Sequence, residues 1–168
     1  MPKLDTLDER ILSALQDDGR LTMKALAEQI GMSSPAVIER VRRLEERGML
    51  TGYRGLVDPT AVGRPLSVII STTVSQPKQE EFLSLLRGHD AVEEVVRVSG
   101  VRNFMIRAHF AGTAELEELM NTLGGLTEAV EAEIVLSIPV QDSPIMPPPD
   151  VVTRRLRATR RRRSATEN

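Results

Sequence analysis

The sequence predicts an α+β protein: an N-terminal helix-turn-helix (winged-helix-like) domain and a C-terminal βαββαβ domain, a ferredoxin-like α/β sandwich. Apolar residues recur every three or four positions as far as Gly48, whereas short β-branched runs alternate with helical stretches from residue 66. Pro59, Gly63 and Pro65 separate the two patterns. The 168 residues can hold two small domains and are too few for a large multidomain enzyme.

Three helices are expected in the first domain. The first covers residues 4–15 and stops at Asp17-Asp18-Gly19. The second follows Thr22, a suitable N-cap, and ends at Gly31, which provides a left-handed turn. The third begins at Ser33-Ser34-Pro35, because proline favours the first helical position. The expected core faces are Leu4, Leu7, Ile11, Leu12 and Leu15 of the first helix, Met23, Leu26, Ala27 and Ile30 of the second, and Val37, Val41 and Leu44 of the third.

The turn between the second and third helices, residues 31–33, has the length found in helix-turn-helix motifs. Residues 49–57 alternate weakly around Gly52 and Gly55 and predict a small hairpin or linker strand. We therefore expect four regions: a helix-turn-helix domain over 1–50, a hairpin or linker over 51–65, the sandwich over 66–142 and a tail over 143–168.

The second domain is expected to alternate strands and helices. Strands are predicted over 66–74, 92–98, 104–110 and 134–140, with one helix over 79–86 and another capped by Thr113. This βαββαβ order places both helices on one face of a four-stranded sheet and leaves the other face open. Self-association would bury the open face. The residues expected on it, themselves or through their neighbours, are Val68, Ile70, Phe104, Ile106 and Val135.

The net charge of -2 conceals three unlike segments. Residues 1–64 carry ten basic and ten acidic side chains, residues 65–150 five and thirteen, and residues 151–168 seven and one. After Pro147-Pro148-Pro149 we expect a disordered tail, rich first in proline and then in arginine. Its arginines can bind DNA phosphates, fold back on the acidic domain, or stay in solvent.

Composition excludes several classes of function. Cysteine is absent, so disulfides, thiolate metal sites and cysteine nucleophiles are excluded. One tyrosine and three phenylalanines make a base-stacking surface for single-stranded nucleic acid improbable. His89 and His109 have no second ligand at metal-binding spacing, so we expect no metal and no cofactor. No stretch resembles a membrane span or signal peptide, which predicts a cytoplasmic protein.

The third helix is the first candidate for function. If its apolar stripe faces the core, the opposite side is exposed and fits the major groove of DNA. Glu39 can accept from cytosine, and Arg42 or Arg43 can form two hydrogen bonds to guanine. An ordinary solvated, salt-bridged helix is an equally good interpretation of the spacing alone. The candidate DNA-binding residues are Ser33, Ser34, Ile38, Glu39, Arg40, Arg42 and Arg43, with Arg20 and Lys24; Ser33 and Arg40 suit phosphates.

Many positions, in order, resemble the Lrp/AsnC (feast/famine) family of transcriptional regulators, and the resemblance spans roughly residues 4–140. The resemblance implies a sequence-specific regulator that binds duplex DNA and a small effector, commonly an amino acid, and that forms homodimers assembling into octamers. The matching positions are Leu4-Asp5, Asp8, Ile11-Leu12, Leu15, Arg20, Leu26-Ala27, Gly31-Met32-Ser33, Arg40-Val41, Leu44-Glu45, Gly48, Gly52-Tyr53 and Gly63.

A glycine-containing turn at residues 98–103 is the second candidate. Its backbone N–H groups can hold an anion, but the pattern alone favours a plain hairpin turn. The family resemblance implies that this loop helps bind the effector at a subunit interface. The residues concerned are Ser99, Gly100, Val101, Arg102 and Asn103, and the family usually has aspartate where Asn103 stands. A neutral amide pairs less strongly with an ammonium group than a carboxylate does.

Two other functions are compatible with this sequence. Siroheme-decarboxylase-like enzymes resemble the same architecture and act on tetrapyrroles, and His109 and Arg107 are the residues that such an enzyme would use. An architectural protein would bind DNA through the third helix and tail with little sequence preference. We expect a regulator rather than an enzyme, because an enzyme does not need the arginine-bearing third helix.

Overall fold

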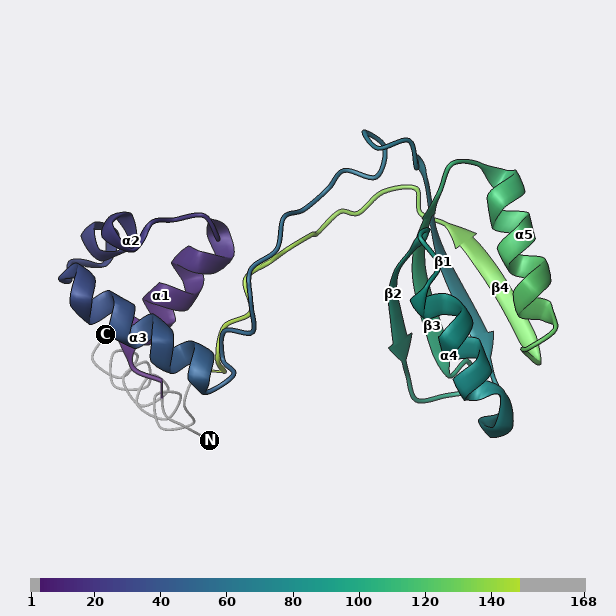
Figure 1. Cartoon of the computed structure of the whole chain (residues 1–168), viewed down its shortest axis with the longest axis horizontal. Coiled ribbons are helices and arrows are strands. Elements are labelled where there is room, and N and C mark those ends of the chain that lie inside the picture. Colours follow the sequence, from purple (N-terminus) through teal and green to yellow (C-terminus); the bar gives the residue numbers. More distant parts are fainter. Residues whose placement is uncertain (1–3, 149–168) are drawn as a thin grey trace, which may run out of the picture. The chain divides into compact units, whose positions relative to one another are not determined.

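The computed structural model describes residues 4–148, which form two compact units (Figure 1). Of the described residues, 4–54 and 142–148 belong to one unit, and the other comprises Gly55–Gln141. Each unit has its own hydrophobic core. No helix within residues 4–148 is long and apolar enough to cross a membrane.

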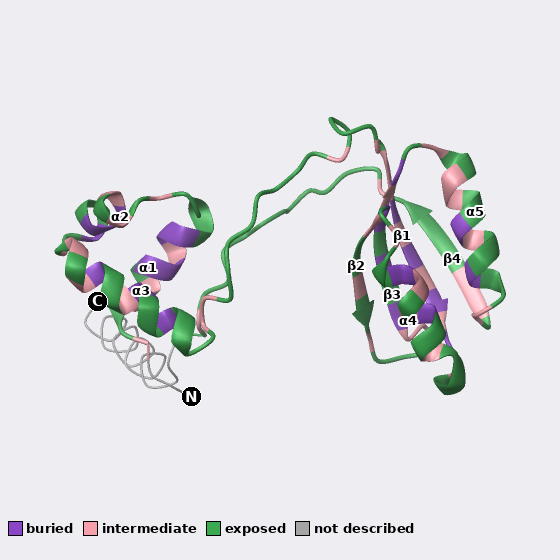
Figure 2. Cartoon of the chain, in the orientation of Figure 1, coloured by how far each residue is buried: buried purple, intermediate pink, exposed green. Residues whose placement is uncertain are grey.

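The first unit contains the predicted three helices, α1 (Thr6–Asp17), α2 (Met23–Ile30) and α3 (Ser34–Glu46). Helix α1 begins two residues later than predicted because Asp5 caps it. The Asp5 carboxylate accepts hydrogen bonds from the backbone N–H groups of Leu7 and Asp8 at 2.9 and 2.8 Å. Leu4 lies outside the helix and still packs on its core. Figure 2 shows that the buried positions form stripes along the three helices.

The caps of α2 confirm the sequence prediction. The Thr22 hydroxyl accepts from the Ala25 N–H at 3.1 Å, and Gly31 adopts a left-handed φ of 79°. The expected hairpin or strand over 49–57 is wrong. Met49 and Leu50 instead turn back to donate to the Leu44 carbonyl, and the residues that follow are exposed and pair with no strand in the part of the chain that the structure describes.

The second unit has the predicted βαββαβ order. Its strands are β1 (Leu66–Thr73), β2 (Val92–Arg97), β3 (Phe104–Phe110) and β4 (Ala129–Ile134), antiparallel in the order β2-β3-β1-β4. Its helices are α4 (Gln79–Arg87), preceded by the short 3-10 turn η1 (Gln76–Lys78), and α5 (Thr113–Gly124). Phe82 and Leu86 of α4 and Leu119 and Leu123 of α5 share one core with the sheet, so both helices cover the same face.

Three details of the second unit differ from the prediction. The last strand is Ala129–Ile134 and not 134–140, because residues 129–134 are the ones that pair with β1, from Thr73 to Val68; the Val135 N–H donates to the Ser67 carbonyl, and residues 136–140 form no strand. Gly112, not Thr113, is the N-cap of α5. The alternation of strand side chains places four predicted open-face residues under the helices instead: Val68, Ile70, Phe104 and Ile106 are buried. The uncovered face carries their neighbours Ile69, Ser71, Met105 and Arg107.

Candidate nucleic-acid interface

Helix α3 presents a charged, accessible side opposite its buried stripe. Val37, Val41 and Leu44 are almost completely buried, as predicted. Ile38 retains 51% of its accessible surface, and the side chains of Glu39, Arg42 and Arg43 are also about half exposed. A helical period of 3.6 residues separates these two sets. The four exposed side chains are therefore available to a partner.

Two carboxylates hold Arg42 on this surface. Its Nη2 and Nε donate to the Glu39 carboxylate at 2.9 and 3.0 Å, and its Nη1 pairs with Glu46. The hydrogen bond from Arg42 lowers the pKa of the Glu39 carboxyl, and the same bond raises the pKa of Arg42. Arg43 lies 3.7 Å from Glu39. Glu39 thus orients both arginines of the exposed side.

Arg40, which the sequence suggests as a phosphate contact, is engaged inside its own unit. Its Nη1 donates to Asp5 at 2.7 Å and to Asp8 at 2.6 Å, and only 20% of its side chain is exposed. These two hydrogen bonds raise the pKa of Arg40. Asp5 and Asp8 also form the capping box of α1. Arg40 therefore ties α3 to the start of α1.

The remaining predicted residues lie at the start of α3 and at the start of α2. Ser33 is the N-cap residue of α3, but its side chain makes no capping hydrogen bond to the helix. Ser34 is half-buried at the first position of α3, Arg20 is exposed in the turn before α2, and Lys24 is exposed on α2 itself.

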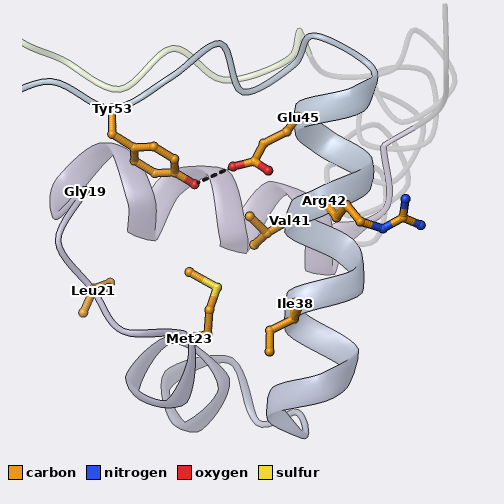
Figure 3. A pocket seen from close by; sticks show the side chains of 8 residues that line it. All are labelled: Gly19, Leu21, Met23, Ile38, Val41, Arg42, Glu45 and Tyr53. Atoms are coloured by element: carbon orange, nitrogen blue, oxygen red, sulfur yellow. Dashed lines mark hydrogen bonds between the residues drawn. The ribbon is translucent and has the colours of Figure 1, made fainter.

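Tyr53 is a feature of this surface that sequence reasoning missed. Figure 3 shows its hydroxyl pointing at Glu45 of α3, to which it donates at 3.2 Å. Burial is the main cause that raises the pKa of this phenol. The ring lies against Gly19, where a Cβ would meet it at 3.6 Å. Both residues belong to the lining of an open groove of about 430 Å³, which is formed by Gly19, Leu21, Met23, Ile38, Val41, Arg42, Glu45 and Tyr53. Periodicity does not find Tyr53, because it stands outside the helix.

The predicted effector loop lies between β2 and β3. Gly100 takes a φ of 123° and Val101 is 84% exposed. Ser99 is exposed, whereas Arg102 is half-buried and pairs with Glu131 of β4. The loop is held to β1, because the Thr73 hydroxyl donates to the Val101 carbonyl at 2.7 Å.

Asn103 uses its whole amide inside the protein. Its Oδ1 accepts from the Val74 N–H at 2.9 Å, and its Nδ2 donates to the Val74 carbonyl at 2.8 Å. An aspartate cannot donate the second of these bonds unless it is protonated. The asparagine here is thus explained by the backbone of the neighbouring strand.

His109 and Arg107, the residues of the enzyme alternative, lie on the uncovered face of the sheet. His109 Nδ1 is 2.9 Å from the Ser67 hydroxyl and its Nε2 is 3.0 Å from Glu93. Arg107 is 4.0 Å from the same carboxylate. Both polar positions of the imidazole are satisfied by neighbours. Within residues 4–148 no group of three or more histidine or acidic side chains is arranged to hold a metal ion.

A helix-turn-helix with an accessible basic helix, joined to a βαββαβ sandwich, defines a two-domain DNA-binding regulator. Comparisons support this class. Residues 4–51 match the model "Winged helix-turn-helix DNA-binding", and residues 67–145 match "Lrp/AsnC ligand binding domain". The chain is 34% identical over 122 residues to the leucine-responsive regulatory protein of Haemophilus influenzae, covering 71% of this chain and 74% of that relative.

Solved structures agree with the sequence relatives. LrpC of Bacillus subtilis superposes with a TM-score of 0.76 at 30% identity, covering 81% of this chain and 96% of that one. The Neisseria meningitidis regulator NMB0573, solved as an L-Met complex, has the same fold, with a TM-score of 0.78 at 24% identity over 85% of this chain and 96% of that one. The chain belongs to the Lrp/AsnC family of transcriptional regulators, as its resemblance predicted. It is a DNA-binding regulator of transcription.

Proposed function

We propose that α3 is the recognition helix and enters the major groove with Ile38, Glu39, Arg42 and Arg43. The observation that carries this proposal is the half-exposed side of α3 opposite a fully buried stripe. Arginine can bind guanine with two hydrogen bonds and glutamate can accept from cytosine, so Arg42, Arg43 and Glu39 would read base edges once they exchange their present partners for the duplex. Ile38 is suited to contact a thymine methyl group.

Phosphate contacts come from the residues around this helix in the same proposal. Ser33, whose hydroxyl is not used to cap the helix, Ser34, Arg20 and Lys24 position α3 on the duplex without reading sequence. Arg40 is not part of this set, since its guanidinium pairs with Asp5 and Asp8 and only 20% of its side chain is exposed, against 55% for Arg42. Its role is to hold α3 against α1.

The test is binding to a duplex selected from random sequence by the wild-type protein. Arg42→Ala with Arg43→Ala should weaken binding to that duplex at least tenfold, since each paired contact contributes about 1–3 kcal/mol. Arg87→Ala is the matched control, because Arg87 is an exposed arginine on α4 that pairs with Glu80. Unchanged affinity of the double variant would refute the assignment of α3. If the wild-type protein binds the selected duplex and a random duplex with nearly equal affinity, the architectural alternative is favoured.

Dimerisation through the uncovered sheet face is the second part of the proposal. Val96 and Met105 are each 40% exposed there, beside Ile69. A two-fold pair would present two recognition helices to half-sites about 34 Å apart. The family resemblance extends this assembly to octamers. Sedimentation of a Met105→Glu variant should show smaller particles than the wild type. An unchanged distribution of sedimentation coefficients would show that the dimer interface does not include this sheet face.

The third part is a small effector, an amino acid or a related molecule, bound at the loop of residues 99–103. The Neisseria regulator with this fold holds L-Met. Asn103 is already bonded to Val74, so the charged groups of the effector would be recognised by the adjacent Arg102–Glu131 pair. Arg102 complements a carboxylate and Glu131 an ammonium group.

A thermal-shift screen of the twenty amino acids tests the effector, since a ligand of the folded state raises the melting temperature. The matching shift should disappear in the Arg102→Gln and Glu131→Gln variants. Glu128→Gln, an exposed residue just before β4, is the control. No shift with any amino acid would exclude this effector class.

A further inference from the structure

Two chain segments connect the helix-turn-helix unit with the sandwich, and both are anchored where they meet the sandwich. The outgoing segment covers residues 51–65, and its Arg64 donates to Glu115 of α5 at 2.8 Å. The returning segment covers residues 135–145, and the Val135 N–H donates to a carbonyl of β1 at 2.9 Å. No residue of either segment belongs to a helix or strand. The freedom of the units therefore depends on where each segment is anchored at its other end.

One side chain of the helix-turn-helix unit anchors the returning segment. Gln16, near the end of α1, accepts from the Ile145 N–H at 2.7 Å and donates to the Ile145 carbonyl at 3.2 Å. Its Nε2 also donates to the Leu12 carbonyl at 3.1 Å, which orients the amide. The Ile145 side chain is 85% exposed, so this anchor consists of hydrogen bonds to the backbone and not of apolar burial.

Tyr53 anchors the outgoing segment close to the same end of α1. Its hydroxyl donates to Glu45 of α3 at 3.2 Å, and its ring lies against Gly19, which follows the end of α1 (Figure 3). The hydrogen bond joins α3 itself to the segment that leads to the sandwich. Both connections are thus fixed to the helix-turn-helix unit by side-chain hydrogen bonds at its surface, which no part of the hydrophobic core requires.

Anchoring both segments leaves residues 54–63 and 136–144 between fixed points. A unit that hangs on one free segment can turn about it, whereas two anchored segments remove part of that rotation. Fewer orientations before binding mean a smaller loss of entropy when two copies of α3 meet one duplex. In a two-fold dimer the anchors therefore favour one distance between the recognition helices.

We propose that Gln16 and Tyr53 are positioning residues for DNA binding, and that by anchoring the returning and outgoing segments they set the half-site spacing that a dimer accepts. The inference rests on the proposed recognition helix and on the proposed dimer. Half-sites read by a two-fold dimer lie one helical turn or a multiple of it apart, because both helices must meet the same side of the duplex. A unit that can turn freely tolerates a half-turn error in this spacing, and an anchored unit does not.

The test measures the affinity of full-length proteins for three duplexes: one half-site, two half-sites at the selected spacing, and two half-sites with about 5 base pairs inserted, which is half a helical turn. Gln16→Ala removes both hydrogen bonds to Ile145, Ile145→Pro removes the N–H donor, and Tyr53→Phe removes the hydroxyl but retains the ring. Gln29→Ala, an exposed glutamine on α2, and Met146→Pro, next to the anchored residue, are the matched controls.

The wild type should bind the selected spacing more tightly than the inserted spacing. Each of the three variants should lower this ratio of affinities by a factor of about two to ten, the net contribution of an ordinary hydrogen bond. Affinity for the single half-site should be unchanged, since α3 and its core are intact. The Ile145 amide hydrogen should exchange faster with solvent in Gln16→Ala than in the wild type, and both controls should behave as the wild type does.

An unchanged ratio in all three variants would overturn the proposal, and so would a wild type that binds both spacings equally. Equal losses on the single half-site and on the paired half-sites would also overturn it, because these residues would then only stabilise the helix-turn-helix unit. Failure of the proposed function is distinguishable: single half-site binding that survives Arg42→Ala with Arg43→Ala refutes the recognition helix, and a monomeric wild type in sedimentation refutes the dimer.

Discussion

The helix-turn-helix unit and the sandwich are stabilised by contacts of different range along the chain. In the first unit Asp5, Thr22 and Gly31 define helix ends through groups a few residues away. In the second, Val68 of β1 lies between Ala108 of β3 and Ile134 of β4. Short-range caps form with little loop-closure cost, whereas the sheet must bring distant segments together. We therefore expect the two units to respond separately to mutation.

The largest expected effect is a core truncation that affects one unit only. Phe104 is buried in the sandwich with its ring centroid 5.0 Å from that of Phe82. Phe104→Ala should destabilise the sandwich by about 3–5 kcal/mol. Hydrogen exchange resolved by residue should show lost protection over residues 66–134 and native protection in α1–α3. Leu44→Ala is the reciprocal variant. Equal loss of protection in both units would show that they unfold together.

The next effect concerns Asn103, whose amide joins two strand ends. Asn103→Asp should destabilise the sandwich by about 1–3 kcal/mol, because the Val74 carbonyl loses its donor and faces a carboxylate. This repulsion should raise the pKa of the new carboxyl. Protonation restores a donor, so the deficit should shrink as the pH falls. Denaturant unfolding of the variant and of Asn121→Asp, an exposed site on α5, measures the difference. A deficit independent of pH would contradict the hydrogen-bond explanation.

Replacing Arg40, in the helix-turn-helix unit, should have a smaller effect on stability. Arg40→Met retains the apolar stem but breaks the pairs with Asp5 and Asp8, and should cost about 1 kcal/mol of helix-turn-helix stability. The sandwich should unfold as in the wild type. DNA affinity of the folded variant should stay close to that of the wild type, in contrast to Arg42→Ala. If the variant loses DNA affinity but no stability, Arg40 binds a DNA phosphate after all.

The smallest expected effect is the contribution of Glu115 to the pH dependence of sandwich stability. A hydrogen bond from the Ala111 N–H, and next Arg64, lower the pKa of Glu115 below its ordinary value of 4.5. A carboxyl with a depressed pKa adds stability above that value, and the contribution is lost as the pH falls through the folded-state pKa. Glu115→Gln should flatten the decline of sandwich stability below about pH 4.5, by less than about 1 kcal/mol. If the variant and the wild type lose the same stability at low pH, that loss is caused by carboxyl groups other than Glu115.

The difference between the units also explains which predictions from sequence failed. Thr22 and Gly31 were predictable because their partners are neighbours in the chain. The bounds of β4 were not, because they depend on which residues pair with β1, a strand about 60 residues earlier in the chain. The strand expected over 49–57 failed for the same reason, since a weak alternation forms no strand without a partner. Residues 149–168, predicted to be disordered, lie outside the described part of the chain.

By itself, the sequence determined the three helices, the order of the sandwich elements and the exposed side of α3, because periodicity and caps act over a few residues. Only the tertiary structure decided what Arg40, Asn103 and Gln16 bind: two aspartates of α1, the backbone of Val74 and the backbone of Ile145. Their partners are distant in sequence, and a polar side chain of given type can serve DNA, effector or protein equally well. Folding brings one of these partners within hydrogen-bonding distance and thereby selects the role.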